Sequence, residues 1–535
     1  MRRILALLSC LIFIIGVSSA AARPLEDPLR IESGLISGFR AGEKKDLLVF
    51  KGVPYAAPPV GELRWKPPQP PVTWGGVKIT RKPCAWCPQP ASVAFARRTG
   101  LQSEDCLYLN VWTMAKDTDE KRPVMVWIHG GGSTTGSGGA LFYSGGRLAR
   151  LGVVVVTINY RLGPLGYLAH PLLSHESDKG VSGNYGFLDQ IAALKWVQRN
   201  ISAFGGDPDN VTIFGESAGA VAVTRLMISP LARGLFHRAI AQSGGPFGRN
   251  RHLRERKYNM KSGEATGEKV AQLLGCDQAD DVLAAMRAKS AEKIIEDAKP
   301  AQGLFGRGIK FGPIVDGWAL PDDPGFLFLE GRMANVPFMV GSNADEGTIF
   351  LKQITIKTPE AYKNMVKIVG RKYASKLLKL FPVNTEEDVK PALNKLIGVS
   401  AFVSNARTMA RAASERQPRV YLYHFTRVPP MGSLKHLGAF HAAEIFYAFG
   451  NIGPVIRQSD PDRNLSDKMM AFWTNFAKTG DPNGEGLPHW PAYETDKDQH
   501  LELGAEIKVG EGLYREACDI FEELLRLRVK ENRPK

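Results

Sequence analysis

The sequence predicts an α/β fold with one large, mostly parallel sheet that helices cover on both faces. Continuous β-branched runs at 124–128 and 153–158 are typical of central strands that are buried on both sides. Amphipathic helical segments alternate with apolar runs along the chain, and this alternation favours parallel strands joined by helical crossovers. With 44% hydrophobic residues and no internal repeat, the chain has the composition of a globular protein with a large core.

The elements of the first half follow in order along the chain. Short strands are expected at 35–42 and 47–56, and the proline-rich stretch 58–74 predicts an extended strap on the surface. A short helix over 141–152, closed by Gly152, should lie between the two central strands. The next elements are an amphipathic helix that begins near 184 and ends at a glycine pair, a strand at 210–214 and a helix at 220–229.

The second half continues the pattern with longer interruptions. Helical segments at 250–300 and 355–415 are interpreted as insertions over one end of the sheet, and 468–484 predicts a further amphipathic helix. Because every strand fits one sheet, we expect a single domain over residues 23–535. The later strands are expected at 239–242, 337–341 and 420–425.

The first 22 residues have the features of a secretory signal peptide. Two arginines precede an apolar run from Ile4 to Val17, and small residues follow at 20–22. This run is short for a membrane span, and no other stretch is long and apolar enough to cross a bilayer. We therefore expect residues 1–22 to be removed and the mature chain to be secreted or periplasmic, without a membrane span.

The chain is basic, with a formal net charge of +15. Its lysines and arginines are dispersed, except in the stretch 249–261, and no zinc-finger or RNA-binding motif accompanies them. This pattern argues against nucleic-acid binding and leaves a solvated basic surface or an anionic substrate. No ligand cluster predicts a metal or a cofactor.

Five cysteines remain after removal of the signal peptide: Cys84, Cys87, Cys106, Cys276 and Cys518. An exported chain can form disulfides, and an odd number leaves at least one thiol unpaired. Cys84 and Cys87 form a CxxC pair, but no second pair follows to complete a zinc site. We expect a disulfide from this pair to Cys106.

The stretch 215–219, Gly-Glu-Ser-Ala-Gly, predicts a nucleophile. It lies between an apolar strand and a helix, where a sharp turn exposes the hydroxyl of Ser217 at the helix N-terminus. The flanking glycines remove the Cβ atoms that would clash in such a turn. A serine in this position attacks a carbonyl only when a base takes its proton.

The chain order serine, acid, histidine restricts the partners of Ser217. His436 and His441 share one loop after a late strand, and the residues alone favour them equally as the base. Asp345 or Glu346, which follow the strand at 337–341, are candidates for the acid, and Asp316 is a weaker one.

The glycine-rich stretch 127–139 predicts a backbone that approaches a reacting oxygen. It is not a linker, because a buried strand runs directly into it, and it is not a phosphate-binding loop, because no Lys-Ser or Lys-Thr follows. His129 is expected to brace this loop rather than to act in catalysis.

Several motifs in order resemble the type B carboxylesterase family, and most closely its secreted microbial members. They are FKGVPYAAPPVGELRWKPPQP, SEDCLYLNVW, VMVWIHGGG, GNYGFLDQIAALKWVQRNISAFGGDPDNVTIFGESAG, SNADEG and HAAEI, and they span nearly all of the mature chain. The resemblance implies the α/β-hydrolase fold, with helical insertions over the active-site end of the sheet. It also implies that the protein is a serine esterase that hydrolyses carboxylic esters without a cofactor or metal.

The resemblance implies a role for individual residues. The catalytic triad of the family falls on Ser217, Glu346 and His441, and Ser243 resembles a serine close to the triad. The remaining correspondences are an oxyanion hole of Gly131, Gly132 and Ala218, a disulfide between Cys87 and Cys106, and ion pairs of Arg64 with Glu104 and Arg161 with Asp189.

The chain departs from the family after the third glycine of the oxyanion loop. Ser133 and Thr134 stand where many members have an aromatic residue, so we expect these two residues to bind substrate and to make the pocket mouth more polar. The loop between Cys87 and Cys106 lacks tryptophan, which argues against choline esters.

Two observations suggest the kind of ester. The positive net charge and the four arginines at 249, 251, 254 and 256 favour an ester with free carboxylates, such as a polycarboxylic acid esterified to a larger alcohol. Two alternatives to hydrolysis are a catalytically idle binding module on the same fold and an acyltransferase that passes the acyl group to an alcohol.

Overall fold

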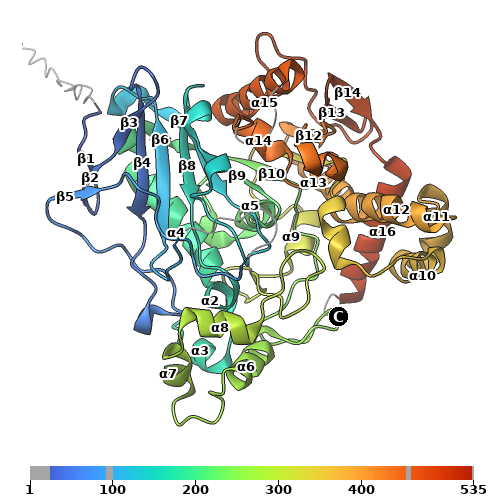
Figure 1. Cartoon of the computed structure of the whole chain (residues 1–535), viewed down its shortest axis with the longest axis horizontal. Coiled ribbons are helices and arrows are strands. Elements are labelled where there is room, and N and C mark those ends of the chain that lie inside the picture. The colour runs from blue at the N-terminus through green and yellow to red at the C-terminus, as the bar shows by residue number, and fades with distance from the viewer. Residues whose placement is uncertain (1–24, 92–100, 454–458, 533–535) are drawn as a thin grey trace, which may run out of the picture.

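A mixed sheet of eleven strands spans the computed structural model, which describes residues 25–91, 101–453 and 459–532 (Figure 1). In order across the sheet, the strands are β14 (Ile507–Glu511), β13 (Gln499–Leu503), β12 (Val420–Phe425), β11 (Phe338–Asn343), β10 (Arg238–Gln242), β9 (Gly206–Glu216), β7 (Arg122–Ile128), β8 (Val154–Ile158), β6 (Tyr108–Thr113), β4 (Leu47–Pro54) and β3 (Phe39–Ala41). The strands from β13 to β8 run parallel, and the strands at the two edges are antiparallel to their neighbours. The predicted mostly parallel sheet is therefore confirmed.

A smaller sheet lies at the N-terminal side of the molecule. Its strands are β1 (Leu29–Ile31), β2 (Gly34–Ser37) and β5 (Val77–Ile79). The strands expected at 35–42 and 47–56 correspond to β2, β3 and β4, whereas β1, β5, β6, β13 and β14 were not expected. The proline-rich stretch 58–74 contains one short 3-10 helix, Gly61–Leu63, and no strand, as an extended strap requires.

Alternate side chains of the central strands enter two separate cores. In β7, Val124 and Val126 pack into the core on one face, whereas Met125 and Trp127 pack into the core on the other. All four side chains are fully buried. This explains the continuous apolar runs, because a strand covered on both faces has no position that faces water.

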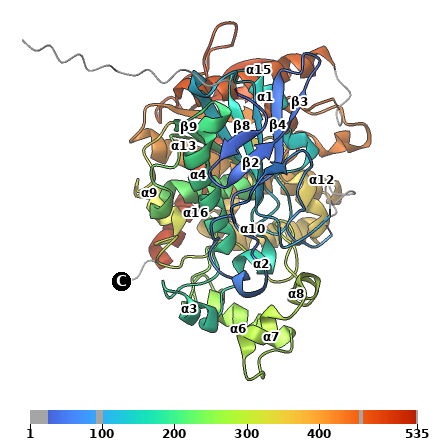
Figure 2. The ribbon, with the colours of Figure 1, turned by 90° about the vertical axis from the view of Figure 1, so that its left-hand side faces the viewer.

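Helices cover both faces of the sheet (Figure 2). Those on one face include α4 (Tyr185–Asn200), α5 (Ala218–Ile228), α9 (Pro324–Leu329) and α13 (Ser404–Ser414), and those on the other include α1 (Gly146–Ala149), α14 (Glu444–Ala448) and α15 (Asp460–Thr479). The helices α2 (Gly163–Tyr167), α3 (Pro171–Glu176), α6 (Gly263–Leu273), α7 (Val282–Arg287) and α8 (Ala291–Ala298) gather at the end of the molecule opposite α15 in both views. The helices α10 (Pro359–Gly370), α11 (Ala374–Leu380), α12 (Glu386–Gly398) and α16 (Arg515–Asn532) pack around a third core beside the sheet.

The helix predicted over 141–152 is broken into two pieces. A 3-10 turn, Leu141–Tyr143, is followed by extended backbone at Ser144 and then by α1. At the break the chain passes close to the sheet, since a Cβ at Gly145 would lie 2.6 Å from a methyl group of Val155. A continuous helix does not allow this approach.

The two predicted insertions are helical, but only one reaches the cavity described below. Residues from α10 to α13 line that cavity, whereas no residue of 250–300 does so. The helices of 250–300 pack instead against α2 and α3. Because α2 follows the carboxyl end of β8, this segment lies at the expected end of the sheet, although it does not line the cavity.

The disulfide between Cys87 and Cys106 is present, and Cys84, Cys276 and Cys518 are free thiols. The two expected ion pairs are also present, between Arg64 and Glu104 and between Arg161 and Asp189. The predicted signal peptide, residues 1–22, lies outside the described residues. Within the described ranges, no helix combines the length and the apolar character that a membrane crossing requires.

The buried ion pair of Arg161 and Asp189 leads to a prediction about stability. Both oxygens of Asp189 accept hydrogen bonds from the guanidinium of Arg161, at 2.8 and 2.7 Å, and neither side chain is exposed to water. Asp189→Asn leaves the guanidinium buried without an opposite charge, so we expect the free energy of unfolding in urea to fall by about 3–5 kcal/mol. The exposed pair of Glu32 and Arg199 provides the control, and Glu32→Gln should cost less than about 1 kcal/mol. Equal losses in the two variants would contradict this account.

Candidate active site

The strand order of the sheet reverses between β7 and β9. From β7 the chain crosses to β8 on one side, and it then returns to form β9 on the other side of β7. At such a point the loops leave in opposite directions and open a crevice at the carboxyl ends of the strands. Gly131 follows β7, Ser217 follows β9, Glu346 follows β11 and His441 follows β12, so all four residues lie at this edge.

Ser217 occupies a strained turn between β9 and α5. Its backbone has φ 55° and ψ −120°, a conformation that typically costs about 1–3 kcal/mol. The turn is fixed by hydrogen bonds from Ser217 N to the carbonyl of Gln242, at 2.9 Å, and from Val221 N to the carbonyl of Ser217, at 3.0 Å. A Cβ at Gly215 or Gly219 would lie 2.6 or 2.0 Å from the carbonyl oxygen of Ile128, so both flanking positions require glycine.

His441 and Glu346 form a buried pair beside this turn. Nδ1 of His441 lies 2.5 Å from Oε2 of Glu346, and the other carboxylate oxygen accepts the backbone N–H of Asn343 at 2.7 Å. The side chain of Glu346 is fully buried and that of His441 is 6% exposed. Because Nδ1 donates to the carboxylate, Nε2 is left as the nitrogen that can accept a proton.

The other candidates, His436 for the base and Asp345 and Asp316 for the acid, do not take part in this buried pair. His436 is exposed, away from the cavity. Asp345 accepts hydrogen bonds from the amide of Asn394 and the backbone of Ala439, at 2.9 and 3.0 Å. Asp316 accepts the backbone N–H groups of its own loop. These carboxylates brace loops and do not contact the imidazole of His441.

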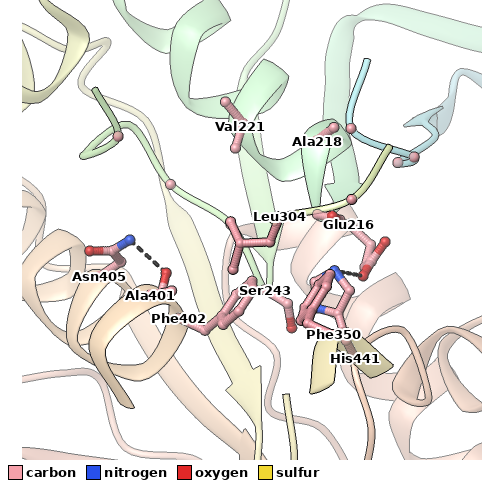
Figure 3. A pocket seen from close by; sticks show the side chains of 18 of the residues that line it. Glu216, Ala218, Val221, Ser243, Leu304, Phe350, Ala401, Phe402, Asn405 and His441 are labelled. Carbon is pink, nitrogen blue, oxygen red and sulfur yellow. Dashed lines mark hydrogen bonds and ion pairs between the residues drawn. The ribbon is translucent and has the colours of Figure 1, made fainter. Parts of the chain in front are cut away.

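A second carboxylate contacts His441 from the strand side. Oε1 of Glu216, the last residue of β9, lies 3.1 Å from Nε2 of His441, as the dashed line in Figure 3 shows. The two atoms do not have the alignment that a hydrogen bond requires, so the contact is an electrostatic one between buried groups. Glu216 lies within the quoted motif, but only the fold shows that it reaches the imidazole.

A third buried carboxylate, Glu444, completes the group. Its oxygens accept hydrogen bonds from the amides of Gln242 and Asn343, at 3.0 and 2.5 Å. The carbonyl oxygen of the Gln242 amide in turn accepts the indole N–H of Trp473 at 3.1 Å. In the sequence, Glu444 is visible only as the glutamate three residues after His441 in the motif HAAEI.

These charges act on one another because they are buried together. Burial raises the pKa of Glu216 to about 8 against the attraction of His441, and Glu444 and Glu346 add to the rise. Burial by itself would lower the pKa of His441, but the charges of Glu216 and Glu346 outweigh it and raise the pKa to about 9. The site therefore strongly stabilises a positive imidazolium.

The glycine-rich loop after β7 lies directly against this turn. A Cβ at Gly130 would lie 3.1 Å from the Cβ of Ser217, and Gly131 and Gly132 adopt positive φ angles of 104° and 65°. The N–H groups of Gly131, Gly132 and Ala218 donate no hydrogen bond within the part of the chain that the structure describes, and all three residues line the same cavity as Ser217. These N–H groups are available to donate to an oxygen atom of a ligand placed next to Ser217.

His129 supports this loop from below. It is fully buried, its ring stacks on Tyr160 at 4.4 Å, and its Nδ1 donates to the carbonyl of Gly130 at 2.8 Å. Burial lowers the pKa of His129 to about 4, so the ring is neutral at neutral pH.

Ser133 and Thr134 do not line the cavity, in contrast to the expectation from the sequence. The hydroxyl of Thr134 is turned inward, where it donates to the carbonyls of Gly132 and Ala301 at 3.2 and 3.3 Å. Ser133 is also buried, with its carbonyl held by the N–H of Gly163. Thr135 and Ser137 are the polar residues of this loop that line the cavity.

The cavity has a volume of about 1250 Å³ and is lined by both apolar and polar side chains. Val221, Leu304 and Phe402 lie on its apolar walls, close to His441, as Figure 3 shows. Trp86, which directly precedes the disulfide loop, also lines it, so the absence of tryptophan inside that loop does not leave the cavity without one. Cavities of this size accommodate a ligand larger than a simple short-chain ester.

Two phenylalanine rings hold the imidazole of His441 in place. The rings of Phe350 and Phe402 lie 5.2 and 4.9 Å from it, and they stack on each other at 6.1 Å. Phe402 belongs to a π-helix, Val399–Val403, between α12 and α13. Short π-helices occur frequently at functional sites.

Ser243, also at the cavity, has a positive φ of 53° and a buried hydroxyl without a hydrogen bond among the described residues.

The described residues contain no group of three or more His, Cys, Asp or Glu side chains arranged to bind a metal ion.

Comparison with known proteins gives a consistent result. The profile of the Carboxylesterase family matches residues 26–521. Fumonisin B1 esterase from Sphingopyxis macrogoltabida is 37% identical over 94% of this chain and 91% of its own. Para-nitrobenzyl esterase from Bacillus subtilis is 37% identical over 86% of this chain and 92% of its own, and human cocaine esterase is 34% identical over 93% and 90%. A solved structure of PNB esterase superimposes with a TM-score of 0.78 at 34% identity, over 92% of this chain and 99% of that one.

The contact between Glu216 and His441 leads to a prediction about the imidazole. Glu216→Gln removes a negative charge 3.1 Å from Nε2, so we expect the pKa of His441 to fall by about 1 or more. An NMR titration of the imidazole C–H resonance measures this pKa. Glu522→Gln is the matched control, because Glu522 lines the same cavity without contacting His441, and the pKa should not change in it. An unchanged pKa in Glu216→Gln would refute the electrostatic role.

Proposed function

This chain belongs to the carboxylesterase family and is a carboxylic ester hydrolase, and we propose that Ser217, His441 and Glu346 are its catalytic triad. The observation that carries the proposal is the buried pair of Nδ1 of His441 and Oε2 of Glu346, 2.5 Å apart, in the same crevice as the strained turn of Ser217. This is the arrangement of base and orienting acid that an otherwise unreactive hydroxyl requires.

Acylation begins when Ser217 attacks the ester carbonyl. Because the pKa of His441 is about 9, the base is the fraction of the imidazole that is neutral. In this form, Nε2 of His441 takes the hydroxyl proton, and Glu346 holds the tautomer that leaves this nitrogen free. The charges of Glu216 and Glu346 stabilise the imidazolium that forms. The same imidazolium then returns the proton to the departing alcohol.

The oxyanion of the tetrahedral intermediate accepts hydrogen bonds from the N–H groups of Gly131, Gly132 and Ala218. Each such donor typically lowers the barrier by about 3 kcal/mol. Water then enters, His441 activates it in the same way, and the acid departs from Ser217. Each step uses side chains and backbone groups of this chain.

We propose that the chain is exported after removal of residues 1–22 and acts as one domain over residues 23–535. The disulfide between Cys87 and Cys106 supports an oxidising compartment. The single sheet that takes strands from Phe39 to Glu511 supports one domain.

We propose that the natural substrate is an ester with free carboxylates, such as a polycarboxylic acid esterified to a larger alcohol. The net charge of +15 and the size of the cavity support this class. Of the four arginines in the segment after β10, only Arg249 lines the cavity. Arg251 bonds to Thr266, and Arg254 pairs with Glu264. The name of one relative, fumonisin B1 esterase, makes fumonisin B1 a candidate substrate to test.

Replacement of the nucleophile tests the triad. Because Ser217→Ala removes the attacking oxygen, kcat for para-nitrophenyl butyrate should fall by a factor of roughly one million, with the circular dichroism spectrum and melting temperature retained. The exposed Ser202 provides the matched control, and Ser202→Ala should keep full activity. A fluorophosphonate probe should label the parent chain and not the Ser217→Ala variant. Turnover that survives in this variant would overturn the assignment of Ser217.

The substrate class is tested by comparing esters that differ in one charge. The para-nitrophenyl monoester of glutaric acid should be hydrolysed with a higher kcat/KM than its neutral methyl ester, and the advantage should shrink between 0.02 and 0.5 M salt, roughly as screening of exposed charges requires. Fumonisin B1 is assayed alongside by product analysis. Equal kcat/KM for the charged and neutral esters at both salt concentrations would rule out this substrate class.

A further inference from the structure

Three arginines from distant parts of the chain line one region of the cavity. Arg249 comes from the loop after β10, Arg371 directly follows α10, and Arg528 lies in the last two turns of α16. Arg249 and Arg371 are exposed, and Arg528 is half-buried. Neither Arg371 nor Arg528 belongs to the basic stretch that stood out in the sequence, so only the packing of α10 and α16 brings the three together.

Arg249 and Arg371 both lie close enough to Arg528 for their charges to act on it. Burial lowers the pKa of Arg528, and the positive charges of Arg249 and Arg371 lower it further, against the attraction of Tyr258 and Asp323. An anion placed among them would relieve this repulsion.

Anions on the protein compensate this positive charge only in part. Arg371 pairs with Glu531, with Nη1 and Oε1 2.6 Å apart. Arg528 donates to the carbonyl of Phe247, a neutral partner. Arg249 makes no ion pair within the described residues. Guanidinium groups that keep unused donors bind carboxylates well, because their planar fork matches two carboxylate oxygens.

The acidic groups that face the cavity do not neutralise the arginines. Glu522 is bound by two other cations, Arg411 at 3.1 Å and Arg526 at 2.8 Å. Glu216 is buried at the other end, against His441. The region around the three arginines therefore carries an excess of positive charge that faces the space available to a substrate.

A short piece of chain joins this region to the nucleophile. Gly244 packs against Ser217, because a Cβ there would lie 2.4 Å from the serine carbonyl oxygen, and Phe247 further along accepts the hydrogen bond from Arg528. Arg249 lies five positions after Gly244 in the chain, so their Cα atoms lie within about 18 Å of each other. This value is an upper limit on the separation of the two backbone positions, and the side chain of Arg249 shortens the distance that an ester with a second carboxylate has to span.

We propose that Arg249, Arg371 and Arg528 form a subsite that binds a free carboxylate of the substrate while its ester group lies at Ser217. This inference rests on the proposed function, and it adds the residues that would select an acidic ester. The free carboxylate belongs either to the acyl part or to the alcohol part of the ester, and the experiment separates the two sources.

The experiment measures a preference ratio, which is kcat/KM for an acidic ester divided by kcat/KM for its neutral analogue. The acyl arm uses the para-nitrophenyl monoesters of glutaric and suberic acid, each compared with the analogue in which the free carboxylate is methylated. The alcohol arm compares para-acetoxybenzoate with the analogue in which its carboxylate is methylated. We expect the ratio to exceed one in the parent chain. It should fall roughly tenfold in Arg528→Gln and several-fold in Arg249→Gln and in Arg371→Gln, since Arg249 and Arg371 are exposed.

Arg254→Gln is the matched control. It removes the same charge from the same segment as Arg249→Gln, but Arg254 pairs with Glu264 outside the cavity, so the ratio should keep its parental value. Arg528→Lys keeps the charge and loses the fork of donors, so it should retain part of the preference if Arg528→Gln does not fold.

The outcomes separate the subsite from the proposed function. A fall in the ratio confined to the three arginine variants supports the subsite, and the arm in which it occurs identifies the part of the ester that carries the carboxylate. A ratio of one in the parent chain, or an equal fall in Arg254→Gln, overturns the subsite and leaves the esterase assignment intact. A failure of the proposed function would be seen separately. In that case the Ser217→Ala variant would hydrolyse neutral esters as fast as the parent chain does.

Discussion

The reversal of strand order between β7 and β9 is the constraint on which the rest of this molecule depends. The crossovers leave the two strands in opposite directions, so their carboxyl ends open a crevice. One loop brings backbone N–H groups to this crevice, and the other turns sharply at Ser217. The two loops can meet only where side chains are absent, and Gly219 therefore lies against the carbonyl of Ile128.

The ends of three neighbouring strands provide the polar floor of the site. Glu216, Gln242 and Asn343 are the last residues of β9, β10 and β11, and their side chains face the buried network around His441. Polar groups at these positions are costly unless each finds a partner, and here amides satisfy the carboxylate of Glu444. The orientation of the imidazole is thus tied to the register of the sheet rather than to a mobile loop.

Features that depend on neighbouring residues were predictable from the sequence. The turn at Ser217 follows from one pentapeptide between a strand and a helix, and the central strands follow from continuous apolar runs that are buried on both faces. The choice between His436 and His441 did not follow from spacing, because both lie in one loop. Only the family resemblance, and then burial, separated them.

Features that depend on packing between distant segments were not predictable. Thr134 turns inward because a carbonyl from the later loop at Ala301 accepts its hydroxyl, and Arg371 and Arg528 face the cavity because α10 and α16 pack beside it. The contact between Glu216 and His441 also joins segments far apart in the chain. No local pattern carries this information.

The π-helix at Val399–Val403 links the shape of the substrate cavity to the position of the His441 imidazole. The insertion that contains it forms part of the cavity wall, and its Phe402 also packs on the imidazole of His441. A change in this insertion that admits a new substrate therefore also alters the packing of the His441 imidazole. Selectivity and turnover are therefore coupled at this wall, so substitutions that broaden the range of esters without slowing the reaction are expected among lining residues outside this insertion, such as Trp86 and Thr135.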